Sequence, residues 1–270
     1  MLGHMLCETD GIQYIKYTGI NNILTCFSCR TGGVSQPPYQ SLNLGLHTGD
    51  DTYNVVRNRE QLGRAVNMPL SKWVTAQQTH GSNLVDVGKC HAGQGSDDYS
   101  YALTDTDGML TREVGLPLVT FYADCVPIFL LDETNGIVGV VHAGWKGTVL
   151  KIAAAAVNRM RQAYNCQLKN IRAIIGPSIG PCCYQVDQPV VKAFHRAFSE
   201  VDDIFKTEDE EHSLLNLWSA NSKVLQEVGL SKDNIYITGL CTSCREELFF
   251  SYRRDKGKTG RMAAMIMRER

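Results

Sequence analysis

The chain has 270 residues, of which 43% are hydrophobic and 20% charged, and its formal net charge is −1. This length and apolar content are enough for a sizeable core, so we expect one domain over residues 1–270, with 1–22 as a leader strand or tail. A net charge this close to zero gives no electrostatic reason to expect nucleic-acid or membrane binding, which favours small molecules as partners.

Strand-like runs dominate the middle of the chain. Each run is rich in β-branched or other apolar residues and is bounded by turn-forming residues. The runs that we expect to form strands are, in chain order, residues 22–30, 72–80, 83–88, 116–124, 126–133, 136–144, 171–179, 234–240 and 263–270.

Four other segments have apolar residues three and four positions apart, which predicts amphipathic helices. They are residues 53–67, 148–165, 189–201 and 214–230. Because these helices alternate irregularly with the strands, the pattern favours an α+β fold with mixed β-sheets over a regular parallel sheet. The acidic stretch 208–212 is expected to be a solvated loop.

The chain has ten cysteines, and their redox state depends on the cellular compartment of the protein. The first 17 residues lack the charged head and apolar middle of a secretory signal, and no run approaches the roughly 20 apolar residues of a membrane span. We therefore expect a cytoplasmic protein with reduced thiols. Two C-x-x-C pairs, Cys26/Cys29 and Cys241/Cys244, allow a four-thiolate zinc site, but each lies in an apolar run where cysteine is commonly a small core residue.

Three side chains of metal-binding type stand where a strand is expected to end at a turn, namely His80, Cys125 and His142. Two imidazoles and one thiolate form the kind of zinc site that keeps a fourth position open for water or substrate. The spacing of 45 and then 17 residues does not match a compact zinc finger, so only a fold that brings three strand ends together would build this site. Taken singly, a backbone-bonded histidine or a core cysteine is the commoner use of each residue.

Two acidic residues are further candidates for the same site. Asp107 and Asp124 are suited to hold imidazole N–H groups beside a metal, or to act on a proton during a reaction. Capping of a turn or of a strand end is an equally common use of such residues.

The segment that follows His142 predicts a place for an anion. Two glycines and Lys146 precede the helix expected from residue 148, and free N–H groups at a helix start beside a lysine suit phosphate. The spacing is not that of a P-loop. Arg59 offers bidentate contacts to the same anion, although such an arginine is commonly structural.

Several longer blocks carry a resemblance to one family. They are SCRTGGVSQPPYQSLNLGLHTGDD, QQTHG, TDTDG, ADCVPIFL, VHAGWKGT, GPSIGPCCYQV and FFSYRRDKGKTGRMAAMI. In this order, from about residue 24 to the C-terminus, they resemble the YfiH or laccase-domain family. Its members have been called multicopper polyphenol oxidases, peptidoglycan editing factors, and purine nucleoside phosphorylases with added adenosine deaminase and methylthioadenosine phosphorylase activities.

The resemblance implies a four-layer α/β/β/α single domain, similar to bacterial toxin deamidases with a Cys/His centre. It also implies zinc bound by His80, Cys125 and His142. The family's usual D-A-D-G block reads T-D-T-D-G here, which keeps both acids, Asp105 and Asp107, and changes the residue between them.

The identity of the metal follows from the ligand types. Zinc suits a set of two histidines and one cysteine with an open position, although one type of copper site uses the same ligands. Laccase chemistry needs several coppers held by many histidines, and the chain has seven histidines in total. The residues therefore favour Zn²⁺ and leave Cu²⁺ as the second choice.

The leading hypothesis is a zinc-dependent purine nucleoside phosphorylase, which uses phosphate to cleave adenosine, inosine or S-methyl-5′-thioadenosine, with adenosine deaminase as a side activity. In this hypothesis Arg59 and Lys146 position phosphate, and Asn43 holds the ribose or the base. Asp107 or His80 assists proton transfer.

Other functional classes remain open from the sequence. One alternative is an amidase-type hydrolase in peptidoglycan editing, with Cys125 as nucleophile and His142 as base. A copper-dependent polyphenol oxidase and a non-enzymatic metal-binding module are the others. The oligomeric state is left open.

Overall fold

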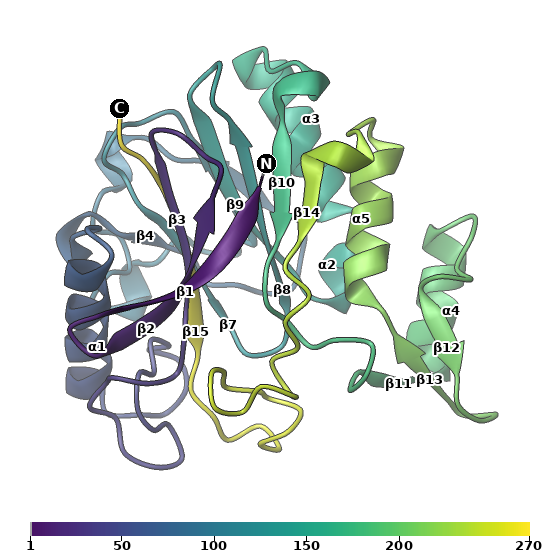
Figure 1. Ribbon diagram of the computed structural model, residues 1–270, viewed down its shortest axis with the longest axis horizontal. Helices are drawn as coiled ribbons and strands as arrows, with labels where there is room; N and C mark the ends of the chain where they lie inside the picture. Colours follow the sequence, from purple (N-terminus) through teal and green to yellow (C-terminus); the bar gives the residue numbers. More distant parts are fainter. Residues whose placement is uncertain (1) are drawn as a thin grey trace.

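The computed structural model describes residues 2–270, and this part of the chain forms fifteen strands and five α-helices (Figure 1). The helices are α1 (Thr52–Ala65), α2 (Trp145–Val149), α3 (Ile152–Tyr164), α4 (Gln188–Ala197) and α5 (Leu217–Glu227). The strands are β1 (Gly3–Thr9), β2 (Ile12–Thr18), β3 (Ile23–Ser28), β4 (Val74–Thr75), β5 (Leu84–Asp86), β6 (Gly108–Thr111), β7 (Leu118–Tyr122), β8 (Val126–Asp132), β9 (Ile137–Ala143), β10 (Arg172–Ile175), β11 (Gln185–Asp187), β12 (Phe205–Thr207), β13 (His212–Leu215), β14 (Ile235–Ile237) and β15 (Met262–Arg268).

Two six-stranded sheets form the centre of the molecule. The first has the order β1-β2-β3-β15-β7-β4, and the second has the order β14-β10-β8-β9-β6-β5. Both are mixed, because β4 pairs parallel to β7 in the first sheet, and β5 to β6 and β14 to β10 in the second. A small antiparallel sheet, β11-β13-β12, lies beside α4 (Figure 1). The predicted α+β fold with mixed sheets is confirmed.

The two large sheets pack face to face, and helices cover their outer faces. In β8, Phe129 and Leu131 pack between the sheets, whereas Ile128 and Leu130 pack in the cluster that includes residues of α3 and α5. This alternation follows from the two-residue period of a strand, and both faces are apolar because both are covered. On the far side, Leu62 of α1 packs against the first sheet. The result is the four-layer α/β/β/α arrangement that the resemblance implied.

The observed elements differ from the predicted ones at several places. Each predicted strand run contains a strand. The bounds of β1 and β2, within the expected leader strand or tail, were not given, and β6 and the three strands of the small sheet were not predicted. The helix expected over 148–165 is broken, because Lys151 has a φ of 59° and separates α2 from α3. The helix expected from residue 214 begins only at Leu217, where the side chain of Asn216 caps α5, and Leu214 and Leu215 belong to β13.

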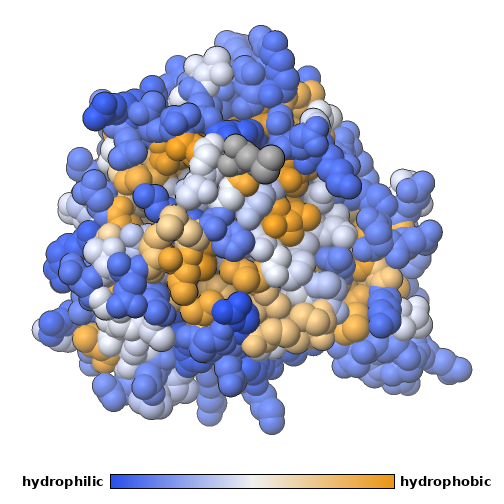
Figure 2. Space-filling view, in the orientation of Figure 1, coloured by the Kyte–Doolittle hydropathy of each residue, from blue (hydrophilic) through white to orange (hydrophobic). Residues whose placement is uncertain are grey.

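The N-terminal strands form an open edge of the first sheet. Residues 1–22, expected as a leader strand or tail, hold β1 and β2, and β1 is the last strand on that side. On the face of the molecule that Figure 2 shows, hydrophilic residues lie around the rim and hydrophobic residues gather toward the middle. Met5 and Leu6 of β1 are exposed. Within residues 2–270 there is no helix of the length and apolar character that a membrane crossing requires.

Candidate active site

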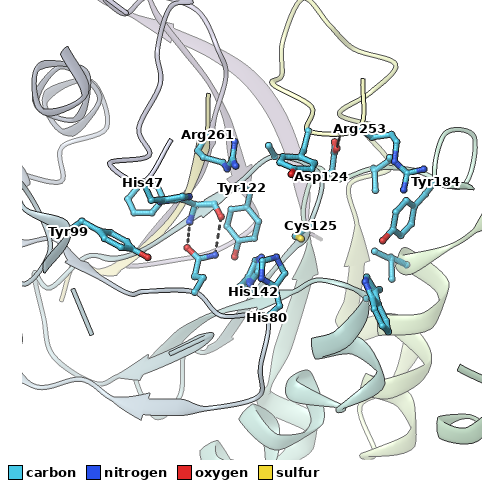
Figure 3. A pocket seen from close by; sticks show the side chains of 17 residues that line it. His47, His80, Tyr99, Tyr122, Asp124, Cys125, His142, Tyr184, Arg253 and Arg261 are labelled. Carbon is cyan, nitrogen blue, oxygen red and sulfur yellow. Dashed lines mark hydrogen bonds between the residues drawn. The ribbon is translucent and has the colours of Figure 1, made fainter. Parts of the chain in front are cut away.

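Three side chains predicted to bind metal meet at one place (Figure 3). His80 lies in the loop after β4, Cys125 in the turn between β7 and β8, and His142 near the end of β9. Their ligating atoms all lie within 4.8 Å of one another. The rings of His80 and His142 meet edge to face, with centroids 4.8 Å apart. The fold thus brings together three residues that are far apart in sequence, as the metal-site hypothesis requires.

The buried carboxylate of Asp107 holds both histidines in place. Its Oδ1 accepts a hydrogen bond from Nδ1 of His142 at 2.7 Å and one from the backbone N–H of His80 at 3.0 Å. Its Oδ2 accepts from the backbone N–H of Gly81 at 2.7 Å. These bonds stabilise the left-handed backbone of His80, whose φ is 64°. Because Asp107 occupies Nδ1 of His142, the Nε2 atom is left for a metal or a proton.

The charges of these groups depend on one another. Burial opposes the charged form of Cys125, but the attraction of His142 and hydrogen bonds from both histidines outweigh it and lower the pKa to about 6. Burial also opposes charge on His142, but Cys125 and Asp107 raise its pKa to about 9. Against burial, the contacts with His142 and the loop N–H groups lower the pKa of Asp107 to about 2. At neutral pH the centre therefore offers a thiolate, the form in which cysteine binds metal or attacks an electrophile.

Asp124, which precedes Cys125, anchors two loops from the C-terminal part of the chain. Its Oδ1 accepts from the hydroxyl of Thr242 at 2.7 Å. Its Oδ2 accepts from the hydroxyl of Ser251 at 3.0 Å and from the backbone N–H of Arg253 at 2.7 Å. Because fixed donors occupy both oxygens, these contacts favour a positioning role, and proton transfer by Asp124 stays a prediction.

A cavity of about 530 Å³ opens in front of His80, Cys125 and His142 (Figure 3). Six aromatic residues line it, namely Tyr99, Phe121, Tyr122, Trp145, Tyr184 and Tyr252. The polar lining includes His47, Gln78, Asp124, Arg253 and Arg261. A concave site with aromatic walls and a few fixed polar groups is typical of small-molecule binding.

Two arginines give the cavity wall a positive character. Arg253 donates from Nη1 to the carbonyl oxygen of Gln185 at 2.6 Å, and its guanidinium lies 5.1 Å from the ring centroid of Tyr184. Arg261 donates from Nη1 to the carbonyl oxygen of Thr259 at 2.9 Å. Since a guanidinium carries five N–H donors, each arginine retains donors for an anionic ligand.

The residues predicted to contact substrate lie outside the lining of this cavity. Asn43 is buried, and its Oδ1 accepts from the backbone N–H of Arg261 at 2.9 Å. Arg59 is buried, donates to three backbone carbonyl groups and lies 4.4 Å from the ring centroid of Phe121. Lys146 is exposed. Asn43 and Arg59 thus support residues of the cavity wall from behind, and direct contact of all three with substrate stays a prediction.

The sequence did not single out much of the cavity wall. His47, Tyr184, Arg253 and Arg261 all line it. They lie within blocks that carry the family resemblance, which was the one signal for them. A block of sequence does not reveal which of its side chains faces a cavity, because that depends on how separate loops pack.

The two C-x-x-C pairs lie in different surroundings. Cys26 and Cys29 are buried in the core, where burial raises the pKa of each to about 12. Cys241 and Cys244 meet two other cysteines instead. The two pairs therefore do not form one four-thiolate site.

Comparison with known proteins places the chain in a family. The family model described as multi-copper polyphenol oxidoreductase laccase matches residues 24–269. A Geobacillus stearothermophilus protein named purine nucleoside phosphorylase YlmD is 41% identical over 238 residues, which cover 88% of this chain and 87% of the relative. A Bacillus subtilis protein of the same name is 40% identical over 257 residues, which cover 94% of this chain and 92% of the relative.

Solved structures agree with this assignment. The crystal structure of a Bacillus licheniformis hypothetical protein YfiH superposes with a TM-score of 0.93 at 38% identity, over 96% of this chain and 97% of the other. The crystal structure of YlmD from Geobacillus stearothermophilus gives a TM-score of 0.93 at 37% identity, over 98% of each chain. The chain therefore belongs to the YfiH family, which the laccase-type family model describes.

Proposed function

We propose that the chain is a metal-dependent purine nucleoside phosphorylase. The observation that carries the proposal is the meeting of His80, Cys125 and His142 at the base of a cavity that has aromatic walls and two arginines. Aromatic rings suit the flat faces of a purine, and guanidinium groups suit phosphate. The names of the relatives from Geobacillus stearothermophilus and Bacillus subtilis support the same activity.

The proposed metal is zinc, held by His80, Cys125 and His142. Two imidazoles and a thiolate within 4.8 Å of one another match the ligand types and number of a catalytic zinc site. When bound, zinc supplies Lewis acidity and lowers the pKa of a coordinated water, which suits deamination of adenosine as a side activity. The hydrogen bond from His142 to Asp107 gives the histidine the fixed orientation that metal ligands in proteins usually have.

In the proposed phosphorolysis, Arg253 and Arg261 orient phosphate beside the ribose. A phosphate oxygen forms a bond to C1′ as the bond from C1′ to the purine nitrogen breaks. The electron pair of that bond goes to the purine, which then takes up a proton, and the products are free base and ribose 1-phosphate. The two arginines stabilise the negative charge of the phosphate. The reaction needs no covalent bond between enzyme and substrate.

The proposal is tested by product analysis with the purified metal-loaded protein. Inosine, adenosine and S-methyl-5′-thioadenosine are each incubated with and without phosphate, and products are separated by chromatography. We expect free hypoxanthine from inosine and free adenine from adenosine only when phosphate is present, and some inosine from adenosine in either condition. Absence of free base with all three nucleosides would refute the proposal.

A second candidate is an amidase-type hydrolase, and one observation favours it. Cys125, His142 and Asp107 have the arrangement of a nucleophile, a base and a residue that orients the base, with 2.7 Å between Nδ1 of His142 and Oδ1 of Asp107. His80 has no role in such a triad but is the third ligand of a metal site. Mass spectrometry of the protein during turnover of peptidoglycan fragments distinguishes the two, because only a nucleophilic Cys125 forms a thioester adduct.

The polyphenol oxidase alternative needs copper. Among residues 2–270, two groups of at least three metal-binding side chains come together, and one of them contains only cysteines. A multicopper oxidase requires several histidine-rich sites. We therefore propose zinc rather than copper, and elemental analysis of the protein after growth with both metals checks this choice.

A further inference from the structure

A second cluster of thiols lies apart from the candidate active site. Cys182 and Cys183 belong to a turn after β10, and Cys241 and Cys244 to a turn after β14. Because β10 and β14 are parallel neighbours, the chain leaves both strands at the same edge of the sheet (Figure 1). The four Sγ atoms all lie within 4.8 Å of one another.

The distances between the sulfur atoms match those around a metal ion. Sγ of Cys244 lies 3.4 Å from Sγ of Cys182 and 3.4 Å from Sγ of Cys183. A disulfide would bring two sulfurs to about 2.05 Å. Zinc bound tetrahedrally by four thiolates at about 2.3 Å places the sulfurs roughly 3.8 Å apart. The cluster is therefore already compact enough to hold one ion.

The backbone around the cluster supports a thiolate. The N–H of Gly180 donates to Sγ of Cys241 at 3.2 Å. A Cβ atom at Gly180 would lie 3.1 Å from Cβ of Cys241, 3.3 Å from Sγ of Cys182 and 2.8 Å from the ring of Trp218, so glycine lets the backbone approach the sulfurs. N–H groups directed at ligand sulfurs are a common support of metal–thiolate sites.

We propose that Cys182, Cys183, Cys241 and Cys244 bind one zinc ion in a structural site. A site with four thiolates has no open position for water or substrate, so it stabilises the fold rather than taking part in the reaction. This second site is separate from the three-ligand centre, and zinc binding there does not depend on the proposed nucleoside chemistry, whereas its expected effect on KM rests on the proposed function.

The position of the site gives it an effect on the cavity. The hydroxyl of Thr242, next to Cys241, donates to Asp124, and the backbone N–H of Ile179 donates to the carbonyl oxygen of Asp124 at 2.9 Å. Ile179 and Tyr184, on either side of the first cysteine pair, line the cavity. Zinc in the cluster would therefore hold together the two turns that carry the cysteines, both of which contact Asp124 and one of which forms part of the cavity wall.

Zinc content of purified variants tests the proposal. We expect about two zinc ions per chain in the unaltered protein and about one in the Cys182→Ser/Cys183→Ser variant. Cys90→Ser, which removes an exposed cysteine outside both groups, should keep about two. The double variant should also unfold at a lower temperature and show a KM for nucleoside raised severalfold, since the cavity wall loosens.

The Cys125→Ala variant separates this proposal from that of the active site. We expect it to keep about one zinc ion, with four sulfur neighbours at about 2.3 Å in the X-ray absorption spectrum at the zinc edge. This measurement needs no change in the cluster, so it holds even if the double cysteine variant fails to fold. Any of four results would overturn the proposal. They are loss of all zinc in Cys125→Ala, nitrogen or oxygen neighbours at the remaining ion, iron in place of zinc, and a disulfide within the cluster.

Discussion

The charge on Cys125 is set by its immediate neighbours. Burial alone would favour the neutral thiol, but His142 and His80 stabilise the thiolate and lower the pKa of Cys125 to about 6. Asp107 in turn holds His142 in the orientation that this interaction requires. The reactivity of this one sulfur therefore reports on the whole arrangement.

The alkylation of Cys125 should follow this pKa in metal-stripped protein. Because the thiolate reacts and the thiol does not, we expect the rate with iodoacetamide to fall as the pH drops through about 6 and to level off above it. His142→Gln removes the positive charge, so burial dominates and the midpoint moves to higher pH. Mass spectrometry of the Cys125 peptide measures the rate, and an unchanged midpoint in His142→Gln would show that His142 does not set this pKa.

Gly144 leaves little room for a side chain beside two of the candidate metal ligands. A Cβ atom there would lie 3.0 Å from Sγ of Cys125 and 3.1 Å from Cδ2 of His80, although its φ of −66° is acceptable for alanine. We expect Gly144→Ala to displace both ligands and to weaken zinc binding by roughly 10–100-fold, with little loss of folding stability.

The control for this effect is Gly88→Ala. Gly88 has a φ of −114°, and a Cβ atom there meets nothing within 4 Å. Competition with a chelator measures zinc affinity in both variants. Equal affinities in Gly144→Ala and Gly88→Ala would contradict the placement of the metal.

At the scale of elements, a buried polar contact joins α2 to α5. The hydroxyl of Thr148 donates to the carbonyl oxygen of Gly144 at 2.9 Å, and Nδ2 of Asn221 donates to that hydroxyl at 3.0 Å. Both side chains are fully buried. This contact connects the helix start beside the candidate active site with the outer helical layer.

Removal of the Thr148 hydroxyl should cost stability. Thr148→Val keeps the shape of the side chain but leaves one buried N–H of Asn221 without its partner, so we expect the free energy of unfolding to fall by about 1–3 kcal/mol. Urea denaturation measures this loss. In a double-mutant cycle with Asn221→Ala, the two losses should be less than additive, and full additivity would show that the contact contributes nothing.

The elements were predictable where local pattern and burial agree. The runs that became β7, β8 and β9 are mostly apolar and buried along their whole length, because layers cover both of their faces. The break at Lys151 could not be predicted, since the apolar spacing runs through residues 148–165 and a lysine gives no signal for the left-handed backbone that it adopts. The bounds of β1, within the stretch expected as a leader strand or tail, were not predicted, because none of its residues is buried and no buried face shapes the sequence pattern.

At the scale of the whole molecule, residue chemistry indicated the candidate metal ligands and the resemblance predicted the layers. His80, Cys125 and His142 could be proposed because their types are those of metal ligands and each lies near a strand end. The cavity wall could not be derived in the same way. Tyr184 and Arg261 reach it from loops far apart in sequence, whose positions depend on tertiary packing. The cysteine cluster likewise joins turns whose proximity follows from the parallel pairing of β10 and β14.

The most direct test of the central claim follows inosine and phosphate by phosphorus NMR with the unaltered protein and with Cys125→Ala. We expect the unaltered protein to form ribose 1-phosphate in a one-to-one ratio with hypoxanthine, and Cys125→Ala, with a circular dichroism spectrum of a folded protein, to form neither. Release of hypoxanthine without ribose 1-phosphate, or full activity in Cys125→Ala, would contradict a metal-dependent phosphorylase at this site.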